Sequence, residues 1–177
     1  LGVKLVQMRL KGMSRNDTYE VLQRSKKLCD AAGAVMVVND HWELAIELHC
    51  DWVHLGQEDL AAADMVAIRR AGLRIGISTH DEEELDKALA LQPDYVALGP
   101  IYPTILKKMK WTEQGLGRVR EWKDYIGDVP LVGIGGLNVE RARGVFSAGA
   151  DIVSVVTDIT LNRQPENRLK EWVAVTR

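Results

Sequence analysis

The sequence predicts one α/β domain, residues 1–177, in which parallel β-strands alternate with α-helices. Short apolar runs recur seven times along the chain, and each stops at glycine or polar residues. A segment with apolar residues at helical spacing follows each run. Strict strand–helix alternation is typical of a parallel sheet that is covered by helices.

The polar or glycine residues after the predicted strands favour a closed barrel. An open, doubly wound sheet concentrates functional residues at one switch point, whereas a (β/α)8 TIM barrel carries them at the ends of many strands. The predicted strands are Lys4–Arg9, Val35–Val38, Trp52–Leu55, Arg74–Ile77, Tyr95–Leu98, Leu131–Ile134 and Ile152–Val156.

The first predicted helix spans Asp17 to Ala32, with Tyr19, Leu22 and Leu28 on its apolar face. Further along, the acidic run Asp81 to Glu84 is predicted to be a solvated helix start, where negative charge complements the helix dipole.

Two later helices have recognisable starts. Asn138 is predicted to cap a helix that runs to about Ser147 and stops at Gly149. Pro165 is predicted to open the last helix, whose apolar residues are Leu169, Trp172 and Val173.

Composition narrows the class of protein. Hydrophobic residues make up 46% and charged residues 27%, and the net charge is −2, so no nucleic-acid or membrane partner is expected. No apolar run is long enough for a membrane span and no signal-peptide pattern opens the chain, so a cytoplasmic protein is expected. Cys29 and Cys50 are interpreted as reduced, structural thiols. The sequence leaves a homo-oligomeric state open.

Two aspartates follow neighbouring predicted strands. Asp40 comes just after Val35–Val38, and Asp59 comes shortly after Trp52–Leu55. Adjacent parallel strands would place these carboxylates side by side, where they repel unless a cation lies between them. Mg²⁺ is often held by one or two carboxylates and substrate phosphates. The alternative is that each aspartate caps the helix that follows it.

The end of the first predicted strand carries an amide and two cations. Gln7, Arg9 and Lys11 alternate, which places all three on one face. An anionic ligand such as a phosphate would explain these cations on an otherwise apolar strand. The alternative is that Arg9 and Lys11 pair with structural acids.

Glycines after a later strand indicate a second phosphate site. Gly135-Gly136 precedes Asn138 and a helix, so backbone N–H groups could approach a phosphate. The next strand ends at Val156-Thr157, and phosphate sites in barrels often follow strands seven and eight.

The longest predicted connection runs from Gly99 to about Gly117. Prolines stiffen its start, and Lys107, Lys108 and Lys110 make it basic. A lid that brings Lys107 onto a bound phosphate would account for this composition; a solvated basic loop is the alternative. At this point the residues indicate a phosphorylated small-molecule substrate that carries pyrophosphate.

Six short motifs, in order, resemble those of the thiamine phosphate synthase family. They are Gln7-Met8-Arg9-Leu10-Lys11, Asn39-Asp40, His54 to Asp59, Gly76 to His80, Gly99-Pro100-Ile101-Tyr102-Pro103-Thr104 and Ile134-Gly135-Gly136. The resemblance implies a (β/α)8 barrel that joins hydroxymethylpyrimidine pyrophosphate to hydroxyethylthiazole phosphate, giving thiamine phosphate and pyrophosphate. It also implies a pyrimidine carbocation that the thiazole nitrogen captures, with no protein nucleophile.

The resemblance also assigns residues. It implies Mg²⁺ on Asp40 and Asp59, and catalytic roles for Arg9, Lys11, Ser78 and Lys107. The pyrimidine pyrophosphate would be bound by Gln7, Met8, Arg9, Leu10, Lys11, Asn39, Ser78 and Lys107. The thiazole phosphate would be bound by Thr104, Ile105, Leu106, Gly136, Val156 and Thr157.

Two alternatives to the synthase stay open, and one departure from the family pattern leaves room for a non-catalytic barrel. The family usually has a threonine where this chain has Leu106. A thiazole tautomerase-like relative would use His80 as its acid and base, although His80 is as readily a structural residue. A non-catalytic barrel that binds a phosphorylated ligand is the third possibility.

The seven visible strand–helix units are expected to be units two to eight of the barrel. The Gln7-x-Arg9-x-Lys11 motif belongs to the second unit of the family, so the first strand would precede Leu1. Lys4–Arg9 and Ile152–Val156 would then be unpaired edges, unless they pair directly.

Overall fold

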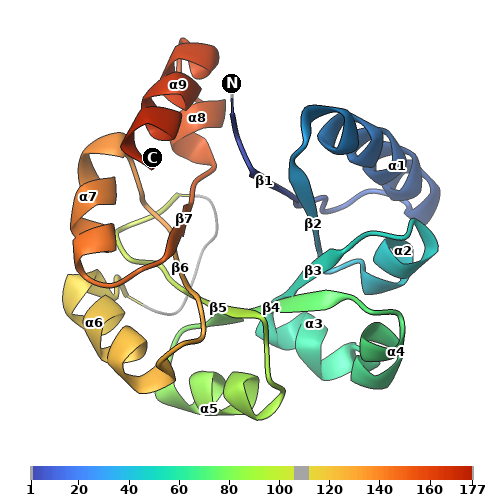
Figure 1. Ribbon diagram of the computed structural model, residues 1–177, viewed down its shortest axis with the longest axis horizontal. Helices are drawn as coiled ribbons and strands as arrows, with labels where there is room; N and C mark the ends of the chain where they lie inside the picture. Colours follow the sequence, from blue (N-terminus) through green and yellow to red (C-terminus); the bar gives the residue numbers. More distant parts are fainter. Residues whose placement is uncertain (1, 106–111, 177) are drawn as a thin grey trace. The chain divides into compact units, whose positions relative to one another are not determined.

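The computed structural model describes residues 2–105 and 112–176, and it has the predicted alternation of strands and helices (Figure 1). Its strands are β1 (Leu5–Met8), β2 (Val35–Asn39), β3 (Trp52–Leu55), β4 (Arg74–Thr79), β5 (Tyr95–Leu98), β6 (Leu131–Ile134) and β7 (Ile152–Ser154). Its helices are α1 (Arg15–Ala32), α2 (Trp42–Glu47), α3 (Gln57–Ala62), α4 (Met65–Arg70), α5 (Glu82–Ala90), α6 (Gly115–Ile126), α7 (Val139–Ser147), α8 (Thr157–Thr160) and α9 (Pro165–Val175).

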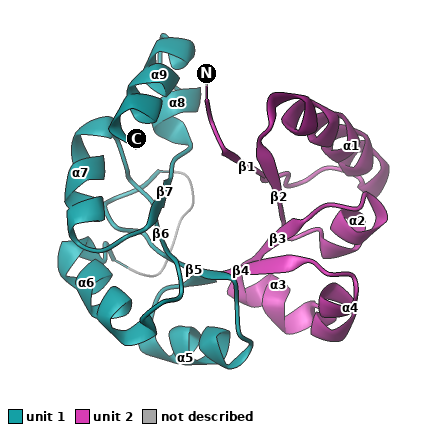
Figure 2. Ribbon diagram, in the orientation of Figure 1, with its two compact units in different colours: residues 1, 78–177 teal, residues 2–77 magenta. Residues whose placement is uncertain are grey.

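The chain divides into two compact units (Figure 2). The N-terminal unit is Gly2–Ile77, and the C-terminal unit is Ser78–Arg177. Each unit is built from the same repeat of strand and helix, so each can be described by itself.

In the N-terminal unit, β1 to β4 pair in parallel in chain order. Val6 is paired with Met36, Val38 with Val53, and Val53 with Ile75. Several strand side chains are fully buried, among them Val38, Val53 and Ile75. Burial of both faces of β2, β3 and β4 is what a parallel sheet under helices requires, and it explains why these strands read as continuous apolar runs.

Helix α1 buries only part of the apolar face that was predicted. Ser14 caps it by accepting a hydrogen bond from the Asp17 N–H, and Leu22 is fully buried as expected. The prediction for Leu28 is wrong, because this side chain is 63% exposed and Cys29 is buried in its place. One residue is about 100° around a helix, so Cys29 lies on the stripe of Leu22 and Leu28 does not.

In the C-terminal unit, β5, β6 and β7 pair in parallel in chain order. Val96 is paired with Leu131, and Val132 with Ile152. Strand β7 ends at Ser154, earlier than predicted, because Val156 has already left extended geometry and precedes α8. Helix α6 starts at Gly115, slightly inside the predicted loop.

The helix starts in this unit follow the predicted capping pattern. Asn138 accepts from the Arg141 N–H at 2.9 Å to cap α7, and Pro165 opens α9. Asp81 accepts from the Glu84 N–H to cap α5. Trp172 of α9 is buried, as its place on the apolar face predicted.

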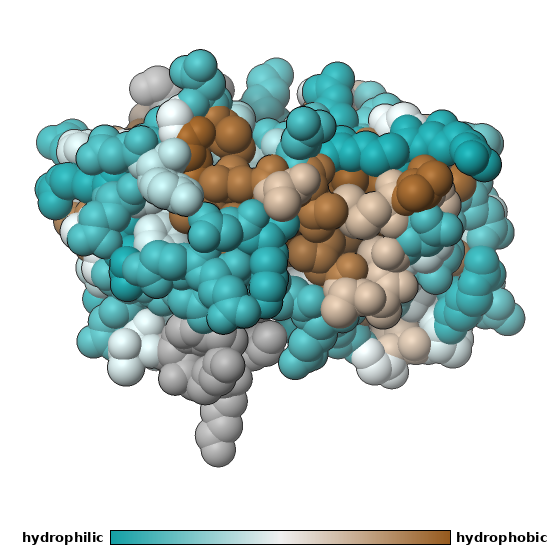
Figure 3. All heavy atoms as spheres, turned by 90° about the horizontal axis from the view of Figure 1, so that it is seen from below, coloured by the Kyte–Doolittle hydropathy of each residue, from teal (hydrophilic) through white to brown (hydrophobic). Residues whose placement is uncertain are grey.

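Large apolar side chains also reach the surface, where they lie among polar ones (Figure 3). The exposed large apolar residues are Leu5, Met13, Leu28, Val66, Ile105, Tyr125, Val156 and Leu161.

None of the helices in the part of the chain that the structure describes is long and apolar enough to cross a membrane.

A buried hydroxyl links β4, β5 and α6. Thr79 donates to the Ala97 carbonyl and accepts from the Trp122 indole N–H, each at 3.1 Å. Both side chains are buried. We expect Thr79→Val to lower the free energy of unfolding by about 1–3 kcal/mol, because the indole N–H would stay buried without an acceptor.

Urea unfolding measures this loss, with Thr176→Val as a control at an exposed hydroxyl that also bonds a carbonyl. An unchanged midpoint for Thr79→Val would show that the buried hydroxyl contributes no net stability.

A carboxylate ties β6 to β7 and α6. Asp151 Oδ2 accepts from the Leu131 N–H at 2.8 Å and from Lys123 Nζ at 2.9 Å. Burial alone would raise the pKa of Asp151, but these two donors outweigh it and the net pKa is lowered. A carboxyl whose pKa is lower in the folded state stabilises the protein above its unfolded pKa, and this contribution is lost as pH falls.

We therefore expect Asp151→Asn to destabilise the protein at pH 7 but to match the wild type more closely at pH 3. The effect at pH 7 should be about 1 kcal/mol or less, because the carboxylate is 44% exposed and screened by solvent. Denaturant midpoints at both pH values test this, with the exposed Asp124→Asn as control. A difference that is equal at both pH values contradicts the electrostatic explanation.

Candidate active site

The two predicted metal-binding aspartates lie together in the N-terminal unit. Asp40 follows β2 directly, and Asp59 lies in the first turn of α3. The ammonium of Lys11 contacts Asp40 Oδ2 and lies 4.0 Å from Asp59 Oδ2. The prediction that both carboxylates share one place is therefore confirmed.

Neither aspartate acts as a helix cap. The cap residue of α2 is His41 and that of α3 is Gly56, and neither helix start has a side-chain cap hydrogen bond. The capping alternative is wrong for both carboxylates, so another cause must hold these two acids together.

Asp40 adopts a left-handed backbone conformation, with φ of 66°. Its N–H donates to the His54 carbonyl at 2.9 Å, and its carbonyl accepts from the Trp42 N–H at 2.8 Å. Aspartate tolerates this conformation better than most residues. The turn ends β2 and starts α2, and the strained residue is the one whose carboxylate meets Lys11.

The electrostatics of this cluster are unusual. The Asp40 side chain is only 9% exposed, and within residues 2–105 and 112–176 its Oδ2 has no hydrogen-bond partner beyond the Lys11 contact. Burial raises the pKa of Asp59, and hydrogen bonding to and repulsion by Asp40 raise it further, while Lys11 opposes the shift. Two carboxylates thus share one partly exposed ammonium.

His54, whose carbonyl accepts from the Asp40 N–H, is a neutral group. It is buried, and burial lowers its pKa to about 4, although the charge of Asp40 acts in the opposite direction. His54 therefore adds no positive charge at pH 7, and compensation of the two carboxylates falls to Lys11.

The segment that carries Lys11 is held by His41. The ring Nε2 of His41 donates to the Leu10 carbonyl at 3.0 Å, since a carbonyl only accepts. Strand β1 ends at Met8, so Arg9 and Lys11 extend beyond it, and the alternation of exposure continues through Gln7, Arg9 and Lys11.

The cations differ in their partners. Lys11 pairs with acids, as the alternative interpretation held, whereas Arg9 is exposed and has no ion pair within the described residues. Asn39 is the last residue of β2, is buried, and is paired with His54 in the ladder. The predicted pyrimidine-site residues of this unit therefore gather at the ends of β1 and β2.

In the C-terminal unit, Ser78 and His80 flank Thr79 at the end of β4. His80 Nδ1 donates to Glu84 Oε2 at 2.7 Å, and the same oxygen accepts from the His80 N–H at 2.9 Å. Glu84 is therefore mostly buried by His80, while Glu82 and Glu83 are exposed as predicted. The i, i+4 spacing of His80 and Glu84 is a sequence signal for this pair.

The Gly135-Gly136 turn packs directly on the start of the long connection. The Ile101 N–H donates to the Ile134 carbonyl at 2.8 Å, and the Tyr102 N–H donates to the Gly135 carbonyl at 3.2 Å. A Cβ on Gly136 would lie 2.4 Å from the Pro103 carbonyl oxygen, and φ there is 65°. Glycine is needed at 136 because backbone lies where a side chain would be.

Arg141 supports this turn, and no pattern in the sequence predicts this role. Its guanidinium donates to the Gly136 carbonyl and lies 4.4 Å from the centre of the Tyr102 ring. No local motif predicts the contact between Arg141 and Tyr102, because the two residues are far apart in the sequence.

The other predicted thiazole-site residues differ in exposure. Thr104 and Thr157 are half-buried, whereas Ile105 and Val156 are exposed. Leu106 and Lys107 lie outside the described residues, as do residues 108–111 of the predicted lid.

The acids of the N-terminal unit suit a cation that needs few protein ligands. Within residues 2–105 and 112–176, no three His, Cys, Asp or Glu side chains gather as a metal site. A two-carboxylate cluster excludes the closed ligand set of a structural zinc site, and it is typical of Mg²⁺ that also binds substrate phosphates.

Two sequence relatives of this chain have the same protein name. A "Thiamine-phosphate synthase" of Rhizobium etli is 55% identical over 176 residues, which cover 99% of this chain and 86% of the relative. A "Thiamine-phosphate synthase" of Neisseria meningitidis serogroup A is 39% identical over 174 residues, covering 98% of this chain and 85% of the relative.

Solved structures confirm the class of fold. The thiamine phosphate pyrophosphorylase of Pyrococcus furiosus matches with a TM-score of 0.87 at 26% identity, covering 99% of this chain and 83% of that one. A 3-hexulose-6-phosphate synthase, at 16% identity and a TM-score of 0.73, shares the fold. The predicted TIM-barrel class of parallel strands and helices is correct.

A model of the family described as "Thiamine monophosphate synthase" matches residues 1–159. With that match and relatives at 55% and 39% identity over nearly its whole length, this chain belongs to the thiamine monophosphate synthase family.

Proposed function

We propose that this protein joins hydroxymethylpyrimidine pyrophosphate to hydroxyethylthiazole phosphate, giving thiamine phosphate and pyrophosphate. One observation carries the proposal beyond family membership: Lys11, which is two residues after the exposed Arg9, forms a single cluster with Asp40 and Asp59. Such a cluster suits a substrate whose leaving group is a polyanion.

We further propose that Asp40 and Asp59 hold Mg²⁺. Three observations support the fit: the pKa of Asp59 is raised by burial and by Asp40, the Asp40 carboxylate is buried, and one ammonium serves both acids. Lys11 stands where a cation is needed. When bound, Mg²⁺ would offset the negative charge of the departing pyrophosphate.

Lys11 has two roles in this proposal. Its ammonium compensates the carboxylates. If Asp40 and Asp59 held Mg²⁺, Lys11 would instead be able to pair with the pyrophosphate, together with Arg9 and Gln7. A lysine on a flexible stem suits such an exchange, since its charge is compact and its pairing is not bidentate.

The remaining roles follow the family pattern. Met8, Leu10 and Asn39 bind the pyrimidine substrate, and Ser78 and Lys107 assist at its pyrophosphate. Thr104, Ile105, Gly136, Val156 and Thr157 bind the thiazole phosphate, in part through backbone N–H groups. Leu106 stands where the family usually has threonine, so one hydroxyl contact to this phosphate is absent.

The tautomerase-like alternative rests on His80. His80 Nδ1 donates a hydrogen bond to the Glu84 carboxylate, so in a neutral ring the proton is on Nδ1 and Nε2 is the basic nitrogen. Such a reaction has no use for paired carboxylates with an ammonium, and this cluster favours the synthase.

Formation of thiamine phosphate from the two substrates, with and without Mg²⁺, separates the synthase, the tautomerase and a non-catalytic barrel. A cytoplasmic location and a homo-oligomeric state stay predictions.

We expect Asp40→Asn or Asp59→Asn to lower turnover by roughly 100-fold or more, because losing a metal ligand removes several kcal/mol of charge stabilisation. The measurement is steady-state formation of thiamine phosphate at limiting Mg²⁺. Neither variant should unfold, because neither carboxylate caps a helix.

Glu58→Gln is the matched control, since Glu58 precedes Asp59 on α3 and is exposed. A second readout is the rise in melting temperature that Mg²⁺ and pyrophosphate cause together, which both aspartate variants should lose. Full activity in both aspartate variants at limiting Mg²⁺ would refute the metal assignment.

A further inference from the structure

Arg168 of α9 is the centre of an ion-pair cluster in the C-terminal unit. Its Nε donates to Asp158 Oδ2 at 2.7 Å and its Nη2 donates to Asp158 Oδ1 at 3.1 Å. The guanidinium also donates to both carboxylate oxygens of Glu140, at 3.2 and 2.9 Å, and to Glu171 at 2.7 Å. These contacts use all five N–H groups of the arginine.

The cluster is more than a surface ion pair. The Arg168 side chain is only 14% exposed, and the buried Trp172 adds an indole N–H that donates to Asp158 Oδ2 at 2.7 Å. Asp158 is thus held by a bidentate arginine and by a tryptophan, all within hydrogen-bond distance. Bidentate arginine–carboxylate pairs hold orientation as well as charge.

The cluster joins three helices. Helix α9 packs against both α7 and α8 (Figure 1). Asp158 belongs to α8 and Glu140 to the first turn of α7, so Arg168 is a bridge between two helix starts.

Both bridged carboxylates are next to segments that the proposed function assigns to the thiazole phosphate. Asp158 follows Val156 and Thr157 directly in the chain. Glu140 precedes Arg141, whose guanidinium donates to the Gly136 carbonyl. Arg168 thereby connects the Gly136 turn with the Val156–Thr157 segment, although it belongs to neither.

We propose that Arg168 is a positioning residue that sets the separation of these two phosphate-binding segments and so controls affinity for the thiazole phosphate. This inference rests on the proposed function. Small displacements of groups that bind a substrate are costly, because binding geometry must be held closely.

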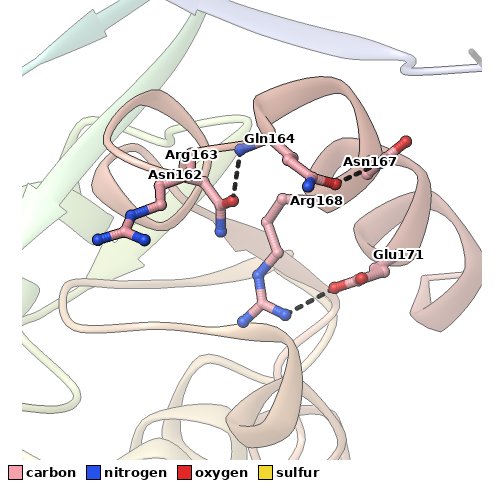
Figure 4. A pocket seen from close by; sticks show the side chains of 6 residues that line it. All are labelled: Asn162, Arg163, Gln164, Asn167, Arg168 and Glu171. Atoms are coloured by element: carbon pink, nitrogen blue, oxygen red, sulfur yellow. Dashed lines mark hydrogen bonds and ion pairs between the residues drawn. The ribbon is translucent and has the colours of Figure 1, made fainter.

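Arg168 does not contact substrate itself. A surface pocket beside it is lined by polar residues (Figure 4), and the view shows Arg168 turned towards Glu171. Since all of its donors are used by carboxylates, Arg168 has none left for a ligand. The residues that line this pocket are Asn162, Arg163, Gln164, Asn167, Arg168 and Glu171.

The test is the kinetics of Arg168→Gln with each substrate varied in turn. We expect the KM for the thiazole phosphate to rise about tenfold and the KM for the pyrimidine pyrophosphate to stay within about twofold. Arg168→Lys should recover only part of the loss, because an ammonium cannot pair bidentately with Asp158.

Arg118→Gln is the matched control. Arg118 of α6 also bridges helices through two carboxylates, Glu82 and Glu121, but neither is next to a phosphate-binding segment. We expect this variant to change stability without a selective change in either KM. Asp158→Asn should reproduce the effect of Arg168→Gln, and the double variant should be no worse than either single variant.

Binding is measured separately from turnover, as the rise in melting temperature caused by the thiazole phosphate alone. A wild-type protein that binds this compound but forms no thiamine phosphate contradicts the proposed reaction and leaves the positioning role to be decided by the same binding series. If Arg168→Gln does not fold, Asp158→Asn carries the test. Unchanged or equally raised KM values in the folded variants, or no binding by the wild type, overturn the inference.

Discussion

The parallel pairing of short buried strands is the constraint on which the rest of this structure depends. A buried backbone must pair its N–H and C=O groups, and the ladders β1–β2–β3–β4 and β5–β6–β7 do so. Apolar strand interiors such as Val53 and Ile75 can carry no chemistry. Charged and polar side chains therefore collect after the strands, at Arg9, Asp40 and His80.

That constraint also explains where the backbone is strained. After β2 the chain must leave the strand and turn within a few residues into α2, and Asp40 does this at positive φ. Sparsely populated conformations persist where surrounding contacts hold them, here the hydrogen bonds to His54 and Trp42. At Gly136 the same need is met by glycine, because the Pro103 carbonyl fills the space of a side chain.

The sequence predicts what local pattern and strand register control. Asp40 and Asp59 could be placed together because each follows an apolar run and neighbouring parallel strands end at the same edge. Asn138 and Pro165 could be identified as helix starts because their effects are local.

Leu28 shows the limit of a helical pattern. The spacing from Leu22, which is nearly two full turns, favours burial of Cys29, whereas the larger apolar side chain favours burial of Leu28, and the structure follows the spacing. Contacts between residues far apart in the sequence could not be predicted either. Arg168 donates to Glu140, twenty-eight residues away, and the Arg141 guanidinium lies over the Tyr102 ring. Such contacts depend on how helices pack, and many sequences with the same periodicity would lack them.

The two cationic clusters differ in whether their pairing can be exchanged. Lys11 is 48% exposed and neutralises two acids with one compact charge, so the pairing is incomplete and open to solvent. Arg168 is 14% exposed, and its five donors are satisfied by three carboxylates in fixed directions. Removing Lys11 from its acids costs little when another cation replaces it. Arg168, in contrast, cannot turn away without leaving the mostly buried Asp158 carboxylate with the Trp172 indole N–H in place of three donors. An exchangeable pair suits a group that must meet a substrate, and a saturated one suits a group that must hold its neighbours in place.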